Sequence, residues 1–222
     1  MDIEVKKVLF LSSGKHLQFA ETAAHSLHKA LKRYGYFYDC VTWSEPEVIG
    51  NNGSTFHELV KRAEELSQND GFAVCVFAPD DLVRMGEDEL EVYSTRDNVV
   101  FEFGLMLGAL GKDRVFYLYN SGTVEGKEMH YPSDLDGING IRCNHSHFDG
   151  YTQEMAQHFA EKLCEKISSI RAAERISDDI ENTSTHSFMQ SNENINNNNI
   201  IIFSKTVDRQ SKLKVRVPFN SR

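Results

Sequence analysis

Short apolar runs alternate along this chain with longer segments whose apolar residues recur at helical spacing. The runs lie at residues 8–11, 37–43, 72–78, 114–119 and 138–143. The helical segments lie at residues 17–34, 55–68, 97–111 and 155–167. A continuously apolar strand is typical of a parallel sheet whose two faces are covered by helices. The alternation therefore predicts an α/β fold with a parallel five-stranded sheet and helices on both faces.

The composition changes near residue 173. Up to about residue 172 the chain has the apolar content of a folded domain, whereas Ser, Asn, Asp and Glu dominate afterwards and Asn fills positions 196–199. A polar composition of this kind favours a flexible segment, because it buries too little apolar surface to offset the entropy of folding. We therefore expect a folded domain over residues 1–172 and a flexible linker and tail over residues 173–222, whose function the sequence does not indicate.

Charge and cysteine use narrow the class of protein. The 222 residues carry a formal net charge of −9, and no helical face of the main domain gathers lysine and arginine, which argues against a nucleic-acid partner. The four cysteines stand far apart, without zinc-site or redox-motif spacing, as in a cytoplasmic protein with reduced thiols. The chain does not open on a signal-peptide pattern, and its longest apolar run, residues 99–111, is too short to span a membrane. We expect a cytoplasmic protein with small-molecule or protein partners.

Glu102 is the one acid inside an otherwise apolar helix. Residues 99–111 are apolar or small apart from Glu102. The pattern predicts a helix that is buried on every side, in which Gly104 and Gly108 allow close approach to a strand. Asp97 or Asn98 is expected to cap this helix. An ionised carboxylate is costly to bury unless it is paired or used in chemistry, so Glu102 needs an explanation.

Two explanations of Glu102 remain open at this stage. The first is a structural ion pair with Arg84, Arg96 or Arg114, in which case Glu102→Gln would lower the melting temperature. The second is a place in a ligand site. Glu102 lies within about two turns of the start of its helix, and that helix follows the third strand, at the edge where α/β sheets bind ligands.

The first strand ends in a turn at the same edge. Ser12, Ser13 and Gly14 offer hydroxyl and backbone N–H groups that suit a phosphate at a helix start. The GxGxxG and Walker patterns are absent, so an ordinary tight turn explains these residues equally well.

The second and third strands also end in residues of interest. Trp43 closes the second strand, where it either stacks on a base or packs against the core. Asp80 and Asp81 follow Pro79 after the third strand, and either bind ribose hydroxyls or cap the loop. Residues 80–96 lack periodicity and are rich in acids, so we interpret them as a long exposed loop.

Two other kinds of site are not expected. Cys143, His145 and His147 alternate along an extended segment, but a convincing fourth metal ligand is missing, and we interpret the histidines as surface residues. The chain has no serine on a G-x-S-x-G elbow, so a Ser-His-Asp hydrolase is also not expected.

Several motifs in this order resemble a known family. They are VLFLSSGKH, a strand ending in Trp43, FAVCVFAPDD, RDNVVFEFGLMLGALGKDRVF and YPSDLDGI. Together, over residues 6 to about 170, they resemble the TIR-like nucleotide-binding domains of bacterial antiphage effectors, including those fused to sensors of cyclic nucleotides. The most specific part is RDNVVFEFG with the basic strand entry that follows.

The resemblance implies a flavodoxin-like sheet and hydrolysis of NAD, with NAD as substrate and no separate cofactor. It implies that Glu102 is the catalytic acid. It also implies that Ser12, Ser13, Gly14, Trp43 and Asp81 line the nucleotide cleft and that Arg96 and Asp97 organise the catalytic helix. Finally, it implies an active homo-oligomer and a cyclic-nucleotide sensor domain or partner, although no such domain is evident in this sequence.

The chemistry is compatible with a single carboxylate. The nicotinamide of NAD departs as a neutral molecule, so no general acid is needed, unlike in ordinary glycosidases. What needs stabilising is an oxocarbenium-like ribose. Two alternatives stay open, a TIR-like interaction module without catalysis and an enzyme resembling nucleoside deoxyribosyltransferases, which also place a glutamate at an N-glycosidic bond.

Overall fold

The computed structural model describes residues 5–43, 55–86, 90–135, 137–143 and 150–193. Five strands form a parallel sheet in the order β2-β1-β3-β6-β8. Their bounds are β1 Lys6–Leu11, β2 Tyr38–Thr42, β3 Phe72–Val76, β6 Val115–Asn120 and β8 Asn139–Cys143. Counted within this sheet alone, the order is 2-1-3-4-5, which is the flavodoxin-like order. The predicted fold class is confirmed.

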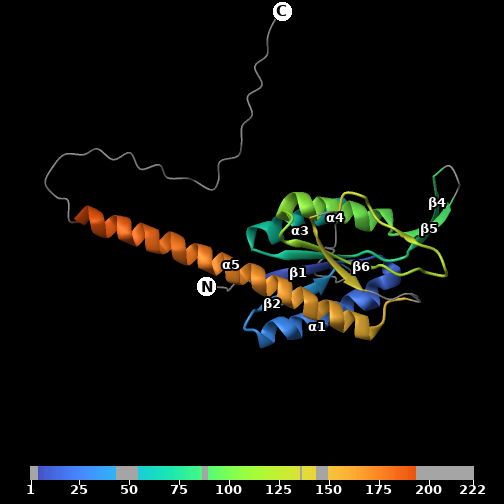
Figure 1. The fold of residues 1–222 in the computed structure, drawn as a ribbon, viewed down its shortest axis with the longest axis horizontal. Coiled ribbons are helices and arrows are strands. Elements are labelled where there is room, and N and C mark those ends of the chain that lie inside the picture. The colour runs from blue at the N-terminus through green and yellow to red at the C-terminus, as the bar shows by residue number, and fades with distance from the viewer. Residues whose placement is uncertain (1–4, 44–54, 87–89, 136, 144–149, 194–222) are drawn as a thin grey trace, which may run out of the picture. The chain divides into compact units, whose positions relative to one another are not determined.

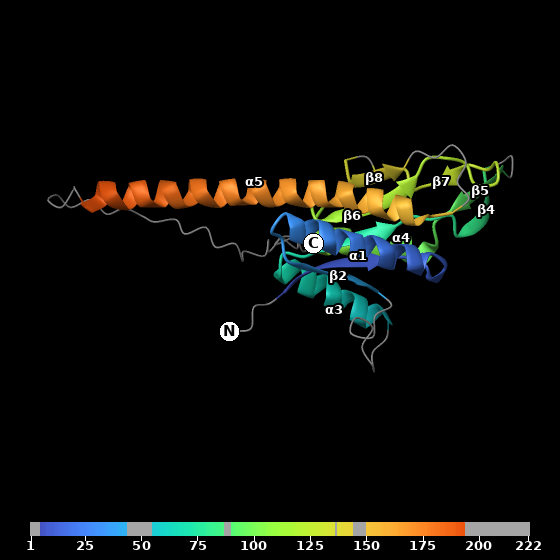
Figure 2. The ribbon, with the colours of Figure 1, turned by 90° about the horizontal axis from the view of Figure 1, so that it is seen from below.

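Helices cover both faces of the sheet (Figures 1 and 2). A short 3₁₀ helix, η1 (Gly14–His16), leads into α1 (Leu17–Arg33), which packs on one face together with the beginning of α5 (Gln153–Glu193). The other face carries α3 (Thr55–Gln68) and α4 (Asp97–Leu110). β3 is buried along its whole length, as expected of a central strand between two helical layers.

The segment between β3 and α4 is not the long loop that we predicted. It forms an antiparallel hairpin of β4 (Asp81–Met85) and β5 (Leu90–Ser94), which pairs with the short strand β7 (Met129–His130). Much of the hairpin is exposed, including the apolar side chains of Leu82 and Leu90. The expected alternation of apolar and polar residues is therefore missing, and the sequence pattern did not reveal the strands.

The last helix is longer than its apolar periodicity indicates. The periodicity ends near Ile167, but α5 continues past Ala173 to Glu193. Contacts within the chain divide it into two compact units, residues 1–176 and residues 177–222. No helix within the described ranges is both long and apolar enough to cross a membrane.

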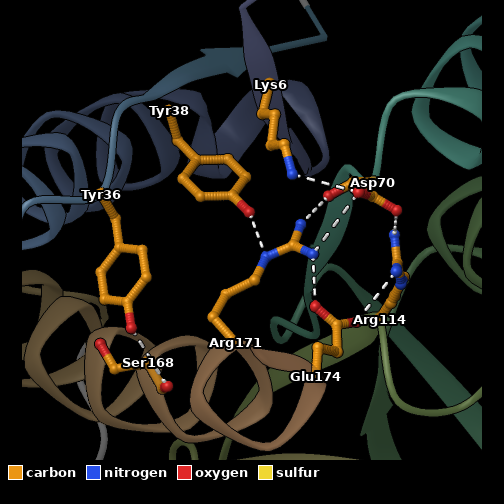
Figure 3. Close-up of polar contacts among 8 residues, drawn as sticks. All are labelled: Lys6, Tyr36, Tyr38, Asp70, Arg114, Ser168, Arg171 and Glu174. Atoms are coloured by element: carbon orange, nitrogen blue, oxygen red, sulfur yellow. Dashed lines mark hydrogen bonds and ion pairs between the residues drawn. The ribbon is translucent and has the colours of Figure 1, made fainter. Parts of the chain in front are cut away.

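A network of charges fastens α5 to the N-terminal edge of the sheet (Figure 3). The Arg171 guanidinium donates to the Tyr38 hydroxyl at 2.5 Å, to Glu174 at 2.5 Å and to the backbone carbonyl of Asp70. Arg114 bridges the Asp70 and Glu174 carboxylates, each at 2.9 Å. Arg171 is 7% exposed. This network lies at the opposite end of the strands from the edge where ligands are expected.

Candidate active site

Helix α4 starts beside the carboxyl end of β3, although a hairpin separates the two in sequence. The backbone N–H of Asp80 donates to the carbonyl of Ser94 at 3.1 Å, which closes the base of the hairpin. The chain thus returns to the strand end before α4 begins at Asp97. Arg96 holds the N-cap position without a side-chain cap bond, so the predicted capping by Asp97 or Asn98 is wrong. Glu102 follows in the second turn of α4, at the edge of the sheet where α/β proteins generally bind ligands.

Glu102 is half-buried and has no charged partner among the described residues. Its carboxylate forms no ion pair or hydrogen bond with any residue that the structure describes. Burial raises the pKa of Glu102 to about 7, because a carboxylate loses hydration in an apolar environment. Glu102 lies on the side of α4 that carries the buried Val99 and Met106, and its charge adds to the effect of burial in raising the pKa of the Cys75 thiol on β3.

The arginines proposed as structural partners of Glu102 are engaged with other acids. Arg96 pairs with Asp81 at 3.4 Å, and Arg84 pairs with Glu91 at 3.5 Å. Arg114 belongs to the network with Asp70 and Glu174. The ion-pair explanation therefore has no support among the described contacts. A half-buried carboxylate with a raised pKa at a ligand-binding edge is a candidate for chemistry.

Asp80 connects the turn after β1 with the start of α4. Its side chain is fully buried and accepts a hydrogen bond from the Ser13 hydroxyl. The backbone N–H of Arg96 lies 3.4 Å from the other carboxylate oxygen, and Nε2 of His16 lies 3.8 Å from the first. Burial lowers the pKa of His16 despite the nearby Asp80 charge, so the imidazole is neutral near pH 7. Asp80 thus holds the turn after β1 and the start of α4 in fixed positions relative to each other.

The predicted turn residues Ser12, Ser13 and Gly14 do lie at this edge. Ser13 is buried and uses its hydroxyl on Asp80 rather than on the start of a helix. Gly14 is exposed within η1, and a Cβ added there would have no neighbour within 4 Å. The turn is therefore tied to the site through Ser13, while Ser12 and Gly14 face more open space.

The other predicted site residues lie on different elements near this edge. Trp43 is half-buried and packs against the apolar cluster beneath α3 and α4, on the same face as Glu102. Asp81 begins β4 and pairs with Arg96, and both side chains are well exposed. Asp97 is exposed in the first turn of α4, where an acid is favoured by the helix dipole.

A polar hollow lies on the other face of the same edge. It has a volume of about 410 Å³ and lies between the starts of α1 and α5, lined by Lys15, His16, Gln18, Phe19, Thr22, Tyr151, Thr152 and Gln153. The Lys15 ammonium donates to the Asp80 carbonyl at 2.5 Å. Sequence reasoning missed Lys15 and His16 and did not retain Asp80, because only the folded chain brings them together. A signal for Asp80 was its position directly after a strand and a proline.

Helix α4 is not buried on every side as its composition predicts. Val99, Phe103 and Met106 face the sheet, whereas Phe101, Gly104 and Gly108 face outward. Phe101 is 57% exposed, and a Cβ added at either glycine would have no neighbour within 4 Å. The glycines therefore do not serve close packing against a strand.

The histidines of the rejected metal pattern, His145 and His147, lie outside the described residues. Cys143 is buried at the end of β8. Among the parts of the chain with assigned positions, no group of three potential metal ligands comes together.

Two curated proteins are similar to part of this chain. CD-NTase-associated protein 12 of Lachnospiraceae bacterium (strain RUG226) is 35% identical over 105 residues, which make up 47% of this chain and 29% of that protein. The Pycsar effector protein PaPycTIR of Pseudomonas aeruginosa is 38% identical over 100 residues, 45% of this chain and 29% of that protein. The chain thus matches less than a third of the length of these two curated relatives.

Two further comparisons cover more than half of this chain. A diflavin flavoprotein A3 from Nostoc sp. aligns with a TM-score of 0.42 and 12% identity, over 79% of this chain and 98% of that one. The family model described as "CAP12/Pycsar effector protein, TIR domain" matches residues 8–145, which span the sheet, the Asp80 contacts and Glu102. The chain therefore belongs to the family of CAP12/Pycsar effector TIR domains.

Proposed function

We propose that this chain cleaves the nicotinamide–ribose bond of NAD to give nicotinamide and ADP-ribose, with Glu102 as the catalytic carboxylate. The observation that carries the proposal is the state of Glu102, which is half-buried, lacks a partner among the described residues and has a pKa raised to about 7. Membership of the TIR effector family supports the same reaction. NAD is the substrate, and no further cofactor is required.

The reaction needs one carboxylate. As the bond from the ribose C1′ to the nicotinamide nitrogen breaks, its electron pair returns to the pyridinium ring and nicotinamide leaves neutral. The positive charge that develops on the ribose lies opposite Glu102, which stabilises it electrostatically. Water then adds to C1′, and its proton passes to Glu102 or to solvent.

Substrate binding favours the charged form of Glu102. An opposite charge within about 4–6 Å lowers the pKa of a carboxyl group. The pyridinium of NAD supplies such a charge, so the raised pKa of free Glu102 should fall when NAD binds. The ionised carboxylate is then present where the oxocarbenium-like ribose forms.

The neighbouring residues at this edge would hold the rest of the nucleotide. Ser12, Gly14, Trp43 and Asp81 are proposed to line the cleft, with Trp43 on the same face as Glu102. Ser13, Arg96 and Asp97 would act mainly by ordering the turn and the start of α4, since Ser13 and the Arg96 backbone both bind Asp80.

The wider role proposed for the chain is that of an antiphage effector. Relatives are named as a CD-NTase-associated protein and a Pycsar effector. By analogy, a cyclic-nucleotide signal sensed by another domain or partner would bring copies of this chain together and so activate NAD cleavage.

The experiment that tests the reaction uses the full chain at high concentration. NAD is added with and without candidate cyclic nucleotides, and nicotinamide is followed by chromatography. A parallel incubation contains a deoxynucleoside and a second free base. Nicotinamide release without base exchange supports the proposal. Base exchange without nicotinamide release would identify a deoxyribosyltransferase, and inactivity in both under every assembling condition would favour an interaction module.

A further inference from the structure

Helix α4 has an apolar outer face that the described part of the chain leaves open. A helix on the surface of a globular protein normally turns charged and polar residues to solvent. The helices α1 and α3 follow this rule, with exposed residues such as Glu21 and Lys61. Between Val99 and Leu110, α4 has no charged residue other than Glu102. An exposed apolar surface of this kind marks a contact with another molecule.

The open face has bulky and empty positions in alternation. Phe101, Leu105 and Gly108 are spaced four and three residues apart and therefore share one side of the helix, with Gly104 beside them. Leu105 is half-buried and also packs against the core cluster beneath α3 and α4. Phe101 is 57% exposed, and Phe56 of α3, 56% exposed, lies beside it with the ring centroids 6.0 Å apart. At Gly104 and Gly108 there is open space. The surface thus has the projecting ring of Phe101 about 10 Å along the helix axis from the open space at Gly108.

A second copy of the same helix fits this pattern when it runs antiparallel. With the two-fold axis between Gly104 and Leu105, Phe101 of each copy lies over Gly108 of the other, and each Leu105 lies over a Gly104. Every bulky side chain then meets a glycine, as packing of ridges into grooves requires. An isologous contact of this kind closes as a dimer.

Charge complementarity points to the same occupant and the same direction. Asp97 stands exposed at the start of α4, and Lys112 stands exposed just past its end. Neither side chain has an ion pair with a residue of the described part of the chain. In the antiparallel arrangement each Asp97 faces the Lys112 of the other copy. Because the chain carries a formal charge of −9, an uncharged face is also where two copies repel least.

We infer that the outer face of α4 is a homodimer interface in which two copies of this chain pack antiparallel, with Phe101 over Gly108. The inference concerns association alone and stands whether or not the chain cleaves NAD. A helix of this length presents a face about 21 Å long, which is small for a stable interface of about 1,200 Å² or more. The dimer is therefore weak, and it forms when copies are concentrated.

The test is sedimentation equilibrium of the full chain over a concentration series. The wild type should show a monomer–dimer equilibrium, and Gly108→Gln should stay monomeric where the wild type dimerises, because its side chain fills the gap. Gly108→Gln should melt at the same or a higher temperature, since glutamine favours helix and the space is open in the monomer. Ala172→Gln, at an exposed small residue of α5, is the control and should dimerise normally.

Charge reversal tests the direction of packing. Asp97→Lys and Lys112→Glu should each weaken the dimer about fivefold, and the double reversal should restore it, since opposite charges face each other again. A double variant weaker than both single variants would exclude the antiparallel pairing. Undiminished dimerisation of Gly108→Gln, or a wild type that is monomeric up to about 1 mM, would overturn the interface itself.

Discussion

The state of Glu102 is what separates this helix from an ordinary core helix. The sequence placed an acid among apolar residues and left two explanations, an ion pair or a ligand site. The pattern of contacts favours the second, because the three arginines that qualify as partners are bound to other acids. The sequence pattern predicted the residue and its edge of the sheet, but not the missing partner, which depends on distances between segments far apart in the chain.

Glu102→Gln should stabilise the fold at high pH. The folded state holds the proton more tightly than the unfolded chain, since the pKa rises from 4.5 to about 7 on folding. The stabilisation from this proton is complete below pH 4.5 and is lost as the pH rises through about 7. At pH 8 the neutral glutamine avoids a cost of up to about 3 kcal/mol.

Urea denaturation at pH 8 and at pH 5 measures this effect. The variant should exceed the wild type in unfolding free energy at pH 8 and differ little from it at pH 5. Glu161→Gln, on the exposed side of α5 and away from its ends, is the control and should change neither value. A lower stability of Glu102→Gln at pH 8 would restore the ion-pair explanation.

The same pKa predicts the pH dependence of catalysis. The active form is the carboxylate, so kcat/KM for nicotinamide release should rise about tenfold per pH unit below pH 7 and level off above it, since kcat/KM reports the free enzyme. His16 does not produce this profile, because burial keeps its pKa below its ordinary 6.5. Initial rates at low NAD concentration between pH 5.5 and 8.5 provide the measurement. An inflection below pH 6 would be inconsistent with Glu102 as the titrating group.

Asp80 and Asp81 are adjacent but should respond very differently to substitution. Asp80→Ala removes a buried carboxylate and leaves Ser13 and the Arg96 N–H without their acceptor, which should cost about 3 kcal/mol. Asp81→Ala breaks only an exposed ion pair with Arg96, so its cost should be below about 1 kcal/mol. Chemical denaturation of the two variants compares them directly. Equal losses of unfolding free energy would mean that Asp80 does not hold the turn after β1 to the start of α4.

At the level of elements, the strands were predictable and the hairpin was not. The continuous apolar runs of β1, β3 and β6 are buried, so their sequence carries the signal of their environment. Strands β4 and β5 lie largely at the surface and expose apolar side chains, so neither alternation nor continuity appears in their sequence. Composition also misled the prediction for α4, since an apolar helix with an open face has the same sequence pattern as a buried one.

The attachment of α5 depends on Arg171. The Arg171 guanidinium lies over the Phe72 ring and binds Tyr38, Asp70 and Glu174, and replacing Arg171 by Met removes this charge while keeping a long apolar side chain. The loss should cost about 2–3 kcal/mol, because the Tyr38 hydroxyl and the Asp70 carbonyl lose a charged donor, while Arg114 still pairs with both acids.

The comparison with a nearby arginine isolates the network. Arg175→Met removes only a cation–π contact with Tyr36 from an exposed side chain and should cost about 1 kcal/mol or less. Thermal unfolding of both variants, fitted for unfolding free energy, gives the measurement. If Arg171→Met is no less stable than Arg175→Met, the network does not hold α5 to the sheet.

On the scale of the whole domain, the charge network around Arg171 and the proposed catalytic residue lie at opposite ends of the parallel strands. The N-terminal edge carries paired charges around Arg171, whereas the C-terminal edge carries Asp80 and Glu102, which has no ion-pair partner among the described residues. The order of strands and helices follows from the sequence, and it determines which residues lie at each end of the parallel strands. The contacts of Asp80 and the exposure of α4 arise only from tertiary packing, and no local pattern encodes them.

The most direct test of this account is the rate of nicotinamide release from NAD by Glu102→Gln beside the wild type, at equal high concentration and pH 8. Glutamine keeps the shape of the side chain and lacks the charge that stabilises the developing oxocarbenium. The rate should fall at least about 100-fold, while the variant stays folded and Glu161→Gln keeps the wild-type rate. Nicotinamide release by Glu102→Gln within about threefold of the wild-type rate would contradict the assignment of Glu102 as the catalytic residue, because a difference that small corresponds to less than about 1 kcal/mol.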